Sequence, residues 1–244
     1  MKYAAKSITG KRQKNEDSYR IPVQEETYPL VAVADGMGGH VAGAVASKLV
    51  INGLNEELSS VREENIIKQL TKAVQSVNLY VYRASQDDRS LDGMGSTLVC
   101  ALLSDKRYIA ANVGDSRLYH FDGTTLTQVT EDHTYVQMLV DDGTITAEEA
   151  RFHPRRNLIT RAMGIGLRTD VDIFDREWQA GNLLLLCSDG LCGSVTDDEM
   201  TDILKTPGLS LDDMCDKLVE LATENGSTDN ITVVLAKNEG SDCA

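Results

Sequence analysis

Apolar residues along this chain gather into two kinds of pattern, and the first predicts β-strands. Short runs of mostly apolar residues that are bounded by turn residues are typical of buried strands. Such runs occupy Tyr3–Ile8, Leu30–Ala34, Thr97–Leu103, Tyr108–Val113, Arg117–Phe121, Leu183–Cys187 and Ile231–Ala236. Asp122-Gly123 directly follows one of these runs and predicts a two-residue hairpin turn.

The second pattern is an apolar stripe at helical spacing, which predicts amphipathic helices between the strands. Such stripes cover residues 41–58, 66–84 and 211–222. Ser210 and Asp213 predict a capping box at the start of the third helix, and Asn225-Gly226 predicts its end. Strands in succession with helices in pairs are typical of a layered α+β fold. No repeat or linker divides the chain, so a single domain over residues 1–240 is expected.

The segment from Asp141 to Gly164 follows neither pattern. It is polar and holds only a short helix signal at Thr146–Glu149. Its basic residues are Arg151, His153, Arg155, Arg156 and Arg161. Long loops inside compact domains are usually functional. A functional loop and a solvated surface insertion both remain open from the residues alone.

Composition narrows the class of protein. The chain has 244 residues, of which 41% are hydrophobic, and a formal net charge of -14. The acidic balance argues against sequence-independent nucleic-acid binding, which depends on clustered Lys and Arg. No apolar run reaches the length of a membrane helix, and no secretory signal is present, so no membrane association is expected. The five Cys have no framework spacing, which favours reduced thiols and a cytoplasmic protein.

Four aspartates stand where strongly apolar strands begin or end. Asp35 follows Leu30–Ala34, and Asp115, Asp189 and Asp229 occupy similar positions. Each alone is more often a plain turn residue, since Asp is common in turns. If the buried strand ends meet at one edge, however, the carboxylates share a cleft, where they repel unless cations bind between them. Carboxylate, carbonyl and water ligands suit Mg²⁺ or Mn²⁺.

Seven short motifs follow one another from Gly10 to Thr232. They are Gly10-Lys11-Arg12-Gln13-Lys14-Asn15-Glu16-Asp17, Val33-Ala34-Asp35-Gly36-Met37-Gly38-Gly39-His40, Gly95-Ser96-Thr97, Asn112-Val113-Gly114-Asp115-Ser116-Arg117, Asn157 through Arg161-Ala162-Met163-Gly164, Ser188-Asp189-Gly190 and Asp229-Asn230-Ile231-Thr232. In this order they resemble the motifs of the protein phosphatase 2C family of metal-dependent phosphatases, and the bacterial branch is the nearer likeness.

The resemblance implies a four-layer αββα sandwich, in which two antiparallel sheets are flanked by helix pairs and metals lie in a channel at one end. It implies a phosphoprotein phosphatase that hydrolyses phosphoserine and phosphothreonine by direct attack of a metal-bridging water. Asp35 would bridge two Mn²⁺ or Mg²⁺ ions, and the Gly36 carbonyl would help hold the first. Asp189 and Asp229 would hold the second, and Asp17 would act through a bound water, with Glu16 beside it.

The same resemblance assigns further roles around the metals. Asp115 would share a third, weaker ion with Asp189, although pairing with Arg117 or capping of a turn is the alternative. Arg12 would bind the phosphate, because its planar guanidinium matches two phosphate oxygens. His40 is a candidate general acid, but animal members carry a His where this chain has Met37, and a metal-bound water or a structural His40 remain alternatives.

The resemblance also gives expectations about partners. Bacterial relatives have a flap in the region corresponding to residues 141–164, which would select phosphoprotein substrates. Those substrates would be targets of a cognate serine/threonine kinase, together with the kinase itself, in cytoplasmic signalling. A monomer is expected.

Other chemistries find less support in the chain. A cysteine phosphatase needs Arg six residues after its Cys, and positions 106, 193, 198 and 221 hold other residues. The glycines after Asp35 lack the dinucleotide-binding spacing, because Val41 stands where a third Gly is needed. A metal phosphohydrolase acting on small molecules remains the open alternative.

Overall fold

The computed structural model describes residues 1–24, 26–38 and 42–240. Within these ranges the strands form two antiparallel sheets. The first has the order β1-β11-β10-β7-β8, with bounds Lys2–Ile8, Ile231–Lys237, Leu183–Cys187, Arg117–Phe121 and Leu126–Gln128. The second has the order β2-β3-β5-β6-β9, with bounds Asp17–Arg20, Leu30–Met37, Leu98–Leu103, Arg107–Val113 and Asp172–Glu177. The short β4 (Gly95–Ser96) pairs with β3.

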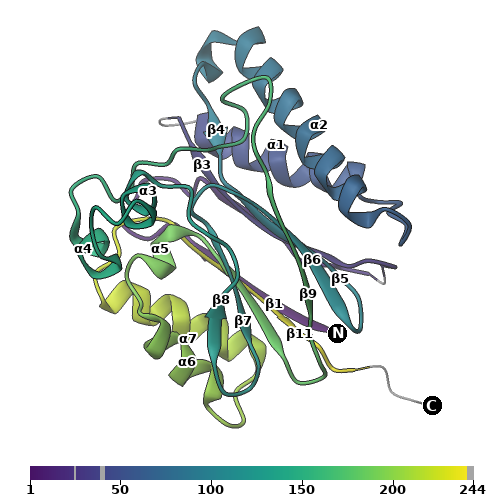
Figure 1. The fold of residues 1–244 in the computed structure, drawn as a ribbon, viewed down its shortest axis with the longest axis vertical. Helices are drawn as coiled ribbons and strands as arrows, with labels where there is room; N and C mark the ends of the chain where they lie inside the picture. The colour runs from purple at the N-terminus through teal and green to yellow at the C-terminus, as the bar shows by residue number, and fades with distance from the viewer. Residues whose placement is uncertain (25, 39–41, 241–244) are drawn as a thin grey trace.

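Helices cover the outer faces of both sheets, which gives the expected αββα sandwich (Figure 1). Helices α1 (Ala42–Glu57) and α2 (Ile66–Asp87) pack on the second sheet, and α6 (Asp197–Lys205) and α7 (Leu211–Glu224) cover the first. The shorter helices are η1 (Arg89–Leu91), α3 (Tyr135–Asp141), α4 (Ala147–Phe152) and α5 (Asp189–Cys192). Within the described residues, no helix combines the length and the apolar character that a membrane-spanning segment requires.

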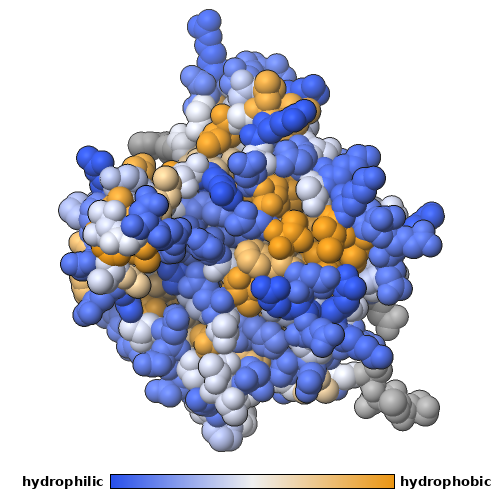
Figure 2. All heavy atoms as spheres, in the orientation of Figure 1, coloured by the Kyte–Doolittle hydropathy of each residue, from blue (hydrophilic) through white to orange (hydrophobic). Residues whose placement is uncertain are grey.

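Three apolar cores hold the four layers together. One lies between the sheets, where Val33, Leu184 and Val234 are fully buried. The others lie under the helix pairs, around Leu54 and Leu70 on one side and around residues such as Leu185 and Leu218 on the other. Because Leu30–Ala34 of β3 and the whole of β10 alternate between two cores, these residues are apolar at every position, which is why the strands were predicted. In Figure 2 apolar atoms gather beside the edge strand β9.

The predicted strands all form, and the expected capping box of Ser210 and Asp213 begins α7. The hairpin prediction was wrong in length. Phe121 pairs with Leu126, so the turn has four residues, because the Asp122 carboxylate accepts hydrogen bonds from the backbone N–H groups of Thr124 and Thr125. The described cysteines Cys100, Cys187, Cys192 and Cys215 are free thiols.

Candidate functional site

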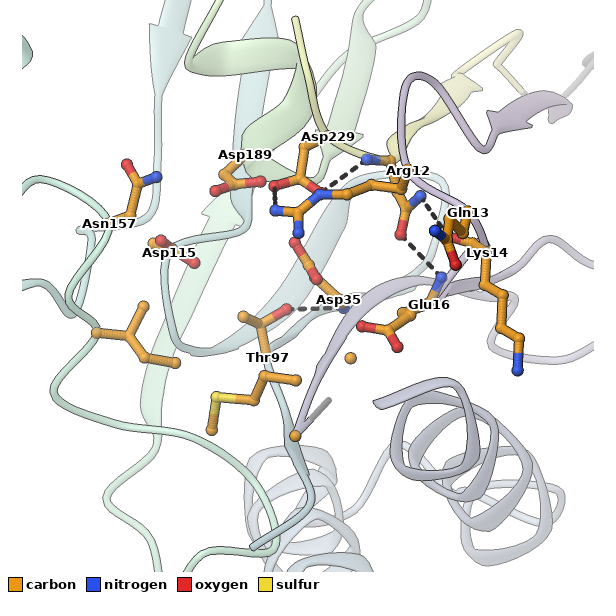
Figure 3. Close-up of a pocket in the computed structure, with 15 residues that line it drawn as sticks. Arg12, Gln13, Lys14, Glu16, Asp35, Thr97, Asp115, Asn157, Asp189 and Asp229 are labelled. Atoms are coloured by element: carbon orange, nitrogen blue, oxygen red, sulfur yellow. Dashed lines mark hydrogen bonds and ion pairs between the residues drawn. The ribbon is translucent and has the colours of Figure 1, made fainter. Parts of the chain in front are cut away.

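A cavity of about 580 Å³ opens at the end of the sandwich where the two sheets meet (Figure 3). Its lining comes from β3, from α5 and from the loops that connect strands of both sheets: Arg12, Gln13, Lys14, Glu16, Asp35, Gly36, Met37, Gly38, Thr97, Asp115, Asn157, Ile159, Asp189, Asp229 and Asn230. The structure therefore brings together Arg12 and the four aspartates of the strand ends, although Arg12 and Asp229 are 217 residues apart. Acidic side chains predominate on the floor of this cavity.

The register of β2 and β3 places two carboxylates side by side. Asp17 and Asp35 are directly opposite each other in this antiparallel pair. Thr97 fixes the Asp35 backbone, because its hydroxyl accepts from Asp35 N–H at 2.9 Å and its N–H donates to the Asp35 carbonyl at 2.8 Å. A carboxylate whose backbone is held on both sides is well positioned for a ligand.

Asp17 links the two sheets from beneath the cavity. Its Oδ2 accepts hydrogen bonds from Ser188 Oγ at 2.8 Å and from Thr232 Oγ1 at 2.6 Å. Both donors belong to the first sheet or its loops, whereas Asp17 begins β2 of the second. Asp17 is therefore a structural link between the sheets as well as a candidate ligand.

Asp189 and Asp229 reach the cavity from adjacent segments of the first sheet. Asp189 begins α5 directly after β10, and Asp229 precedes β11, the partner of β10. Arg12 Nη2 donates to Asp229 Oδ2 at 2.7 Å, and more than half of the Arg12 side chain is exposed. Figure 3 shows the guanidinium between Asp229 and Asp35, with its remaining donors directed into the cavity.

Burial and crowding raise the pKa values of the carboxylates in this cluster. Burial, followed by the charges of Asp17, Asp189, Asp115 and Asp229, holds the pKa of Asp35 well above its usual range. Burial and the charge of Asp229 raise the pKa of Asp189 to about 6. Burial also raises the pKa of Asp17 to about 6, against the opposing effect of its two hydroxyl donors. In the absence of cations, ionising this cluster is unfavourable.

The oxygen atoms present fit divalent hard cations. Asp17 Oδ1 and Asp189 Oδ1 are buried without a hydrogen-bond partner, and buried acceptors of this kind are normally satisfied. Among the described residues, no three His, Cys, Asp or Glu side chains are set so that they could hold one ion between them. In this structure Asp35, Asp189 and Asp229 therefore line one cavity without meeting at a single point, and an ion shared by all three requires their side chains to turn toward it.

Close backbone approach shapes the loop after Asp35. A Cβ on Gly36 would collide with the backbone carbonyl of Gly43, and a Cβ on Gly43 would lie 2.9 Å from Glu16 Oε2. The Glu16 carbonyl accepts from Gly36 N–H at 3.2 Å. Glycine at both positions lets α1 start against this loop, with the Glu16 carboxylate beside it.

Asp115 occupies the turn between β6 and β7, at the edge of the same cavity. Burial and the neighbouring charge of Asp189 raise its pKa to about 8. Arg117 is engaged elsewhere, because its guanidinium forms a two-point ion pair with Asp132 and donates to Tyr119. The alternative in which Asp115 pairs with Arg117 is therefore not the arrangement that the structure adopts.

His40 and the basic residues of the segment 141–164 were also predicted to act at the site. His40, the candidate general acid, lies outside the described residues. The basic residues of the segment 141–164 divide into two groups, because Arg151, Arg155 and Arg156 are exposed, whereas Arg161 forms a 2.8 Å ion pair with Asp172.

Several residues that hold the site were not singled out from the sequence. Thr97 fixes Asp35, and Asn230 joins the start of β11 to the loop between β1 and β2, because its side chain accepts from Glu16 N–H and donates to the carbonyls of Thr9 and Lys14. Asn157 points toward the cavity from the segment 141–164 (Figure 3). All three residues lie within the seven sequence motifs, and this was the signal in the sequence that could have identified them.

Comparisons with known proteins agree with this geometry. A family model described as Protein phosphatase 2C matches residues 6–236. The serine/threonine phosphatase Stp of Listeria welshimeri is 41% identical over 230 residues, which cover 93% of this chain and 91% of that protein. The crystal structure of serine/threonine phosphatase Stp1 from Staphylococcus aureus superposes with a TM-score of 0.91 at 38% identity, covering 98% of this chain and 95% of the other.

A further solved structure bears on the metal site. The catalytic domain of the serine/threonine protein phosphatase PstP, in complex with two manganese ions, has a TM-score of 0.84 at 38% identity, and the match covers 97% of both chains. The fold and the acidic cavity define a metal-dependent phosphatase architecture. With the match over residues 6–236, this chain belongs to the protein phosphatase 2C family.

Proposed function

We propose that this chain is a metal-dependent phosphoprotein phosphatase that hydrolyses phosphoserine and phosphothreonine by direct attack of water on phosphorus. The observation that carries the proposal is the cluster of Asp35, Asp189 and Asp229 around one cavity, with the Arg12 guanidinium between Asp229 and Asp35. Buried acceptors without donors and pKa values raised by mutual repulsion support a site that binds cations.

Each carboxylate has a distinct place in this proposal. Asp35 and the Gly36 carbonyl would hold one Mn²⁺ or Mg²⁺ ion, and Asp35 would share a second with Asp189 and Asp229. Such a pair of cations supplies a water nucleophile at neutral pH and offsets charge on the phosphoryl group. Asp17 keeps Ser188 and Thr232 in place beneath the cluster and directs its free Oδ1 as an acceptor for a water.

Arg12 would bind the phosphoryl oxygens. Its guanidinium has five donors, and the hydrogen bond to Asp229 leaves others free to face the cavity. The ion pair with Asp229 also aims the side chain, since an exposed Arg would otherwise sample many rotamers. The substrate phosphate would therefore lie between Arg12 and the carboxylate cluster.

Asp115 is proposed to share a third, weaker ion with Asp189. Asp115→Ala is expected to lower turnover and to raise the Mn²⁺ requirement by about tenfold or more, because a weakly held ion has few protein ligands. Two ions should still bind tightly in calorimetry. Asp92→Ala, in an exposed Asp-Gly turn, is the matched control. Turnover and Mn²⁺ response equal to those of the parent would make Asp115 a turn residue.

The segment 141–164 is proposed to act as a flap that selects phosphoproteins. Replacing the exposed Arg151, Arg155 and Arg156 with Ala is expected to reduce phosphoprotein turnover severalfold more than turnover of a small aryl phosphate, because only a protein substrate extends onto this surface. The control replaces the exposed Arg62, Arg83 and Arg89, which changes the net charge equally. Equal losses on both substrates would indicate a structural role.

The proposed partners follow from the substrate class. They are phosphorylated proteins, among them targets of a cognate serine/threonine kinase and that kinase itself, acted on by a monomer in cytoplasmic signalling. The substrate class is tested by phosphate release from phosphothreonine and phosphotyrosine peptides of identical flanking sequence, with free nucleotides as a third substrate. Preference for phosphothreonine is expected. Faster turnover of nucleotides would favour the small-molecule phosphohydrolase instead.

A further inference from the structure

A buried histidine outside the cavity lining braces the turn that carries Asp115. His133 lies in the loop between β8 and α3 and is 6% exposed. Its backbone N–H donates to the Gly114 carbonyl at 3.0 Å, and its ring Nδ1 accepts from the Gly114 N–H at 3.0 Å. One residue therefore holds both polar groups of Gly114, the neighbour of Asp115.

These contacts fix the protonation of the ring. Nδ1 must carry a lone pair to accept from Gly114, so a neutral imidazole has its proton on Nε2. Nε2 lies 3.0 Å from Asp172 Oδ2 and donates to it. Asp172, at the start of β9, thus orients His133 as a carboxylate orients an imidazole in many functional sites.

The braced turn depends on this support. Gly114 has φ of +107°, and a Cβ there would lie 2.7 Å from Thr97 Cγ2. Thr97 is the residue that fixes Asp35, and its hydroxyl also bonds to Ser116 Oγ at 2.7 Å. The turn is thus held by Thr97 and Ser116 on one side and by His133 on the other.

The base of the flap joins the same histidine. Thr160 N–H donates to the His133 carbonyl at 2.8 Å. Arg161 Nη1 donates to Asp172 Oδ1 at 2.8 Å and lies 3.0 Å from His133 Nε2. A displacement of Thr160 or Arg161 at the base of the flap would therefore move His133, which supports Gly114.

We propose that His133 is a positioning residue, which sets Asp115 for the third cation by holding the Gly114 peptide and connects this turn to the flap base through Asp172 and Arg161. The inference rests on the proposed third ion at Asp115. The competing interpretation is a buried histidine that contributes only to stability.

Two substitutions separate these interpretations. Asn carries its amide oxygen near the position of ring Nδ1, so His133→Asn retains an acceptor for Gly114 but loses the bond to Asp172. Gln reaches toward the position of Nε2, so His133→Gln retains the bond to Asp172 but leaves Gly114 N–H without its acceptor. A purely structural role predicts similar effects of the two changes on the third site once their thermal stabilities are matched.

The experiment has two readouts on the full chain. The first is hydrogen exchange of the Gly114 amide in the metal-free protein, which should be retarded in the parent and in His133→Asn but fast in His133→Gln. The second is Mn²⁺ binding followed by electron paramagnetic resonance. His133→Gln should weaken the third binding event about tenfold or more, His133→Asn less, and His120→Asn, at a half-buried histidine of β7, not at all.

The outcomes distinguish the inference from the function on which it rests. If Asp115→Asn leaves the third binding event unchanged, the third site itself is wrong, and the proposal falls with it. If Asp115→Asn abolishes that event but His133→Gln and His133→Asn are alike in both readouts, His133 is structural only. Should His133→Gln fail to fold, His133→Leu, which also lacks an acceptor for Gly114 N–H, replaces it, and an unchanged third binding event there would overturn the proposal.

Discussion

Replacement of Asp35 by Asn is expected to lower Mn²⁺-dependent phosphate release by about 10³-fold or more, since a cation at this site contributes several kcal/mol of charge stabilisation. Asp35 lies at the centre of the cluster, where burial and the four other carboxylates hold its pKa well above the usual range. Asn preserves the shape of the side chain and the backbone bonds to Thr97 but removes the charge that would bridge two cations. Phosphothreonine peptide turnover is the measurement.

Stability measurements show whether the loss comes from the site or from the fold. In EDTA, Asp35→Asn should melt at the same temperature as the parent or higher, because one of several mutually repelling charges is gone. With Mn²⁺ the parent should gain stability by mass action, whereas the variant should gain much less. Asp92→Asn, in an exposed turn, is the control for charge. A variant that melts far lower in EDTA would indicate misfolding.

Replacement of Arg12 by Ala is expected to lower kcat/KM for phosphopeptide by about 10²-fold, the usual effect of removing one donor that stabilises transition-state charge. KM should rise and kcat should fall, because the same guanidinium would hold phosphate in both the ground and the transition state. Arg12→Lys should recover only part of the loss, since an ammonium cannot bind two oxygens in a fork.

The neighbouring Lys11 supplies the control for Arg12. It is exposed and is not part of the cavity lining, so Lys11→Ala removes the same charge without the proposed contact. Arg12→Ala also frees Asp229 from its ion pair. An effect that came only through Asp229 would appear as altered Mn²⁺ affinity with unchanged KM for phosphopeptide. Unchanged kinetics would make Arg12 a solvated surface residue.

Strands buried on both faces were the most predictable part of the fold. Leu183–Cys187 and Leu30–Ala34 are apolar at every position, because two cores contact their two faces. Strands β2 and β9 were missed, since Asp17–Arg20 and Asp172–Glu177 carry charged side chains that a strand at the edge of a sheet leaves partly in water. Helix α6 was missed because it is short and the acidic residues Asp197-Asp198-Glu199 fill its first turn, which leaves few apolar positions at helical spacing.

The candidate site was likewise predictable only in part. The aspartates at strand ends were predicted to share a cleft, because buried antiparallel strands end together at one edge of the sandwich, and Asp35, Asp115, Asp189 and Asp229 do line one cavity. The long-range contacts by which motif residues hold these aspartates were not predictable. Thr97 and Asn230 act on residues 62 and 214 positions away, and no local pattern encodes such a pairing. His133 was hidden for the same reason, since its partner Asp172 is 39 residues away.

On the proposed function, this acidic cavity hydrolyses phosphoprotein esters only when it holds divalent cations. Titration of the metal-free protein with Mn²⁺, with phosphate release from a phosphothreonine peptide measured at each step, tests it most directly. The parent protein should release no phosphate in EDTA and should recover activity as two ions bind tightly, and Asp35→Asn should not recover. Full turnover by the metal-free protein, or recovery in Asp35→Asn equal to that of the parent, would contradict it.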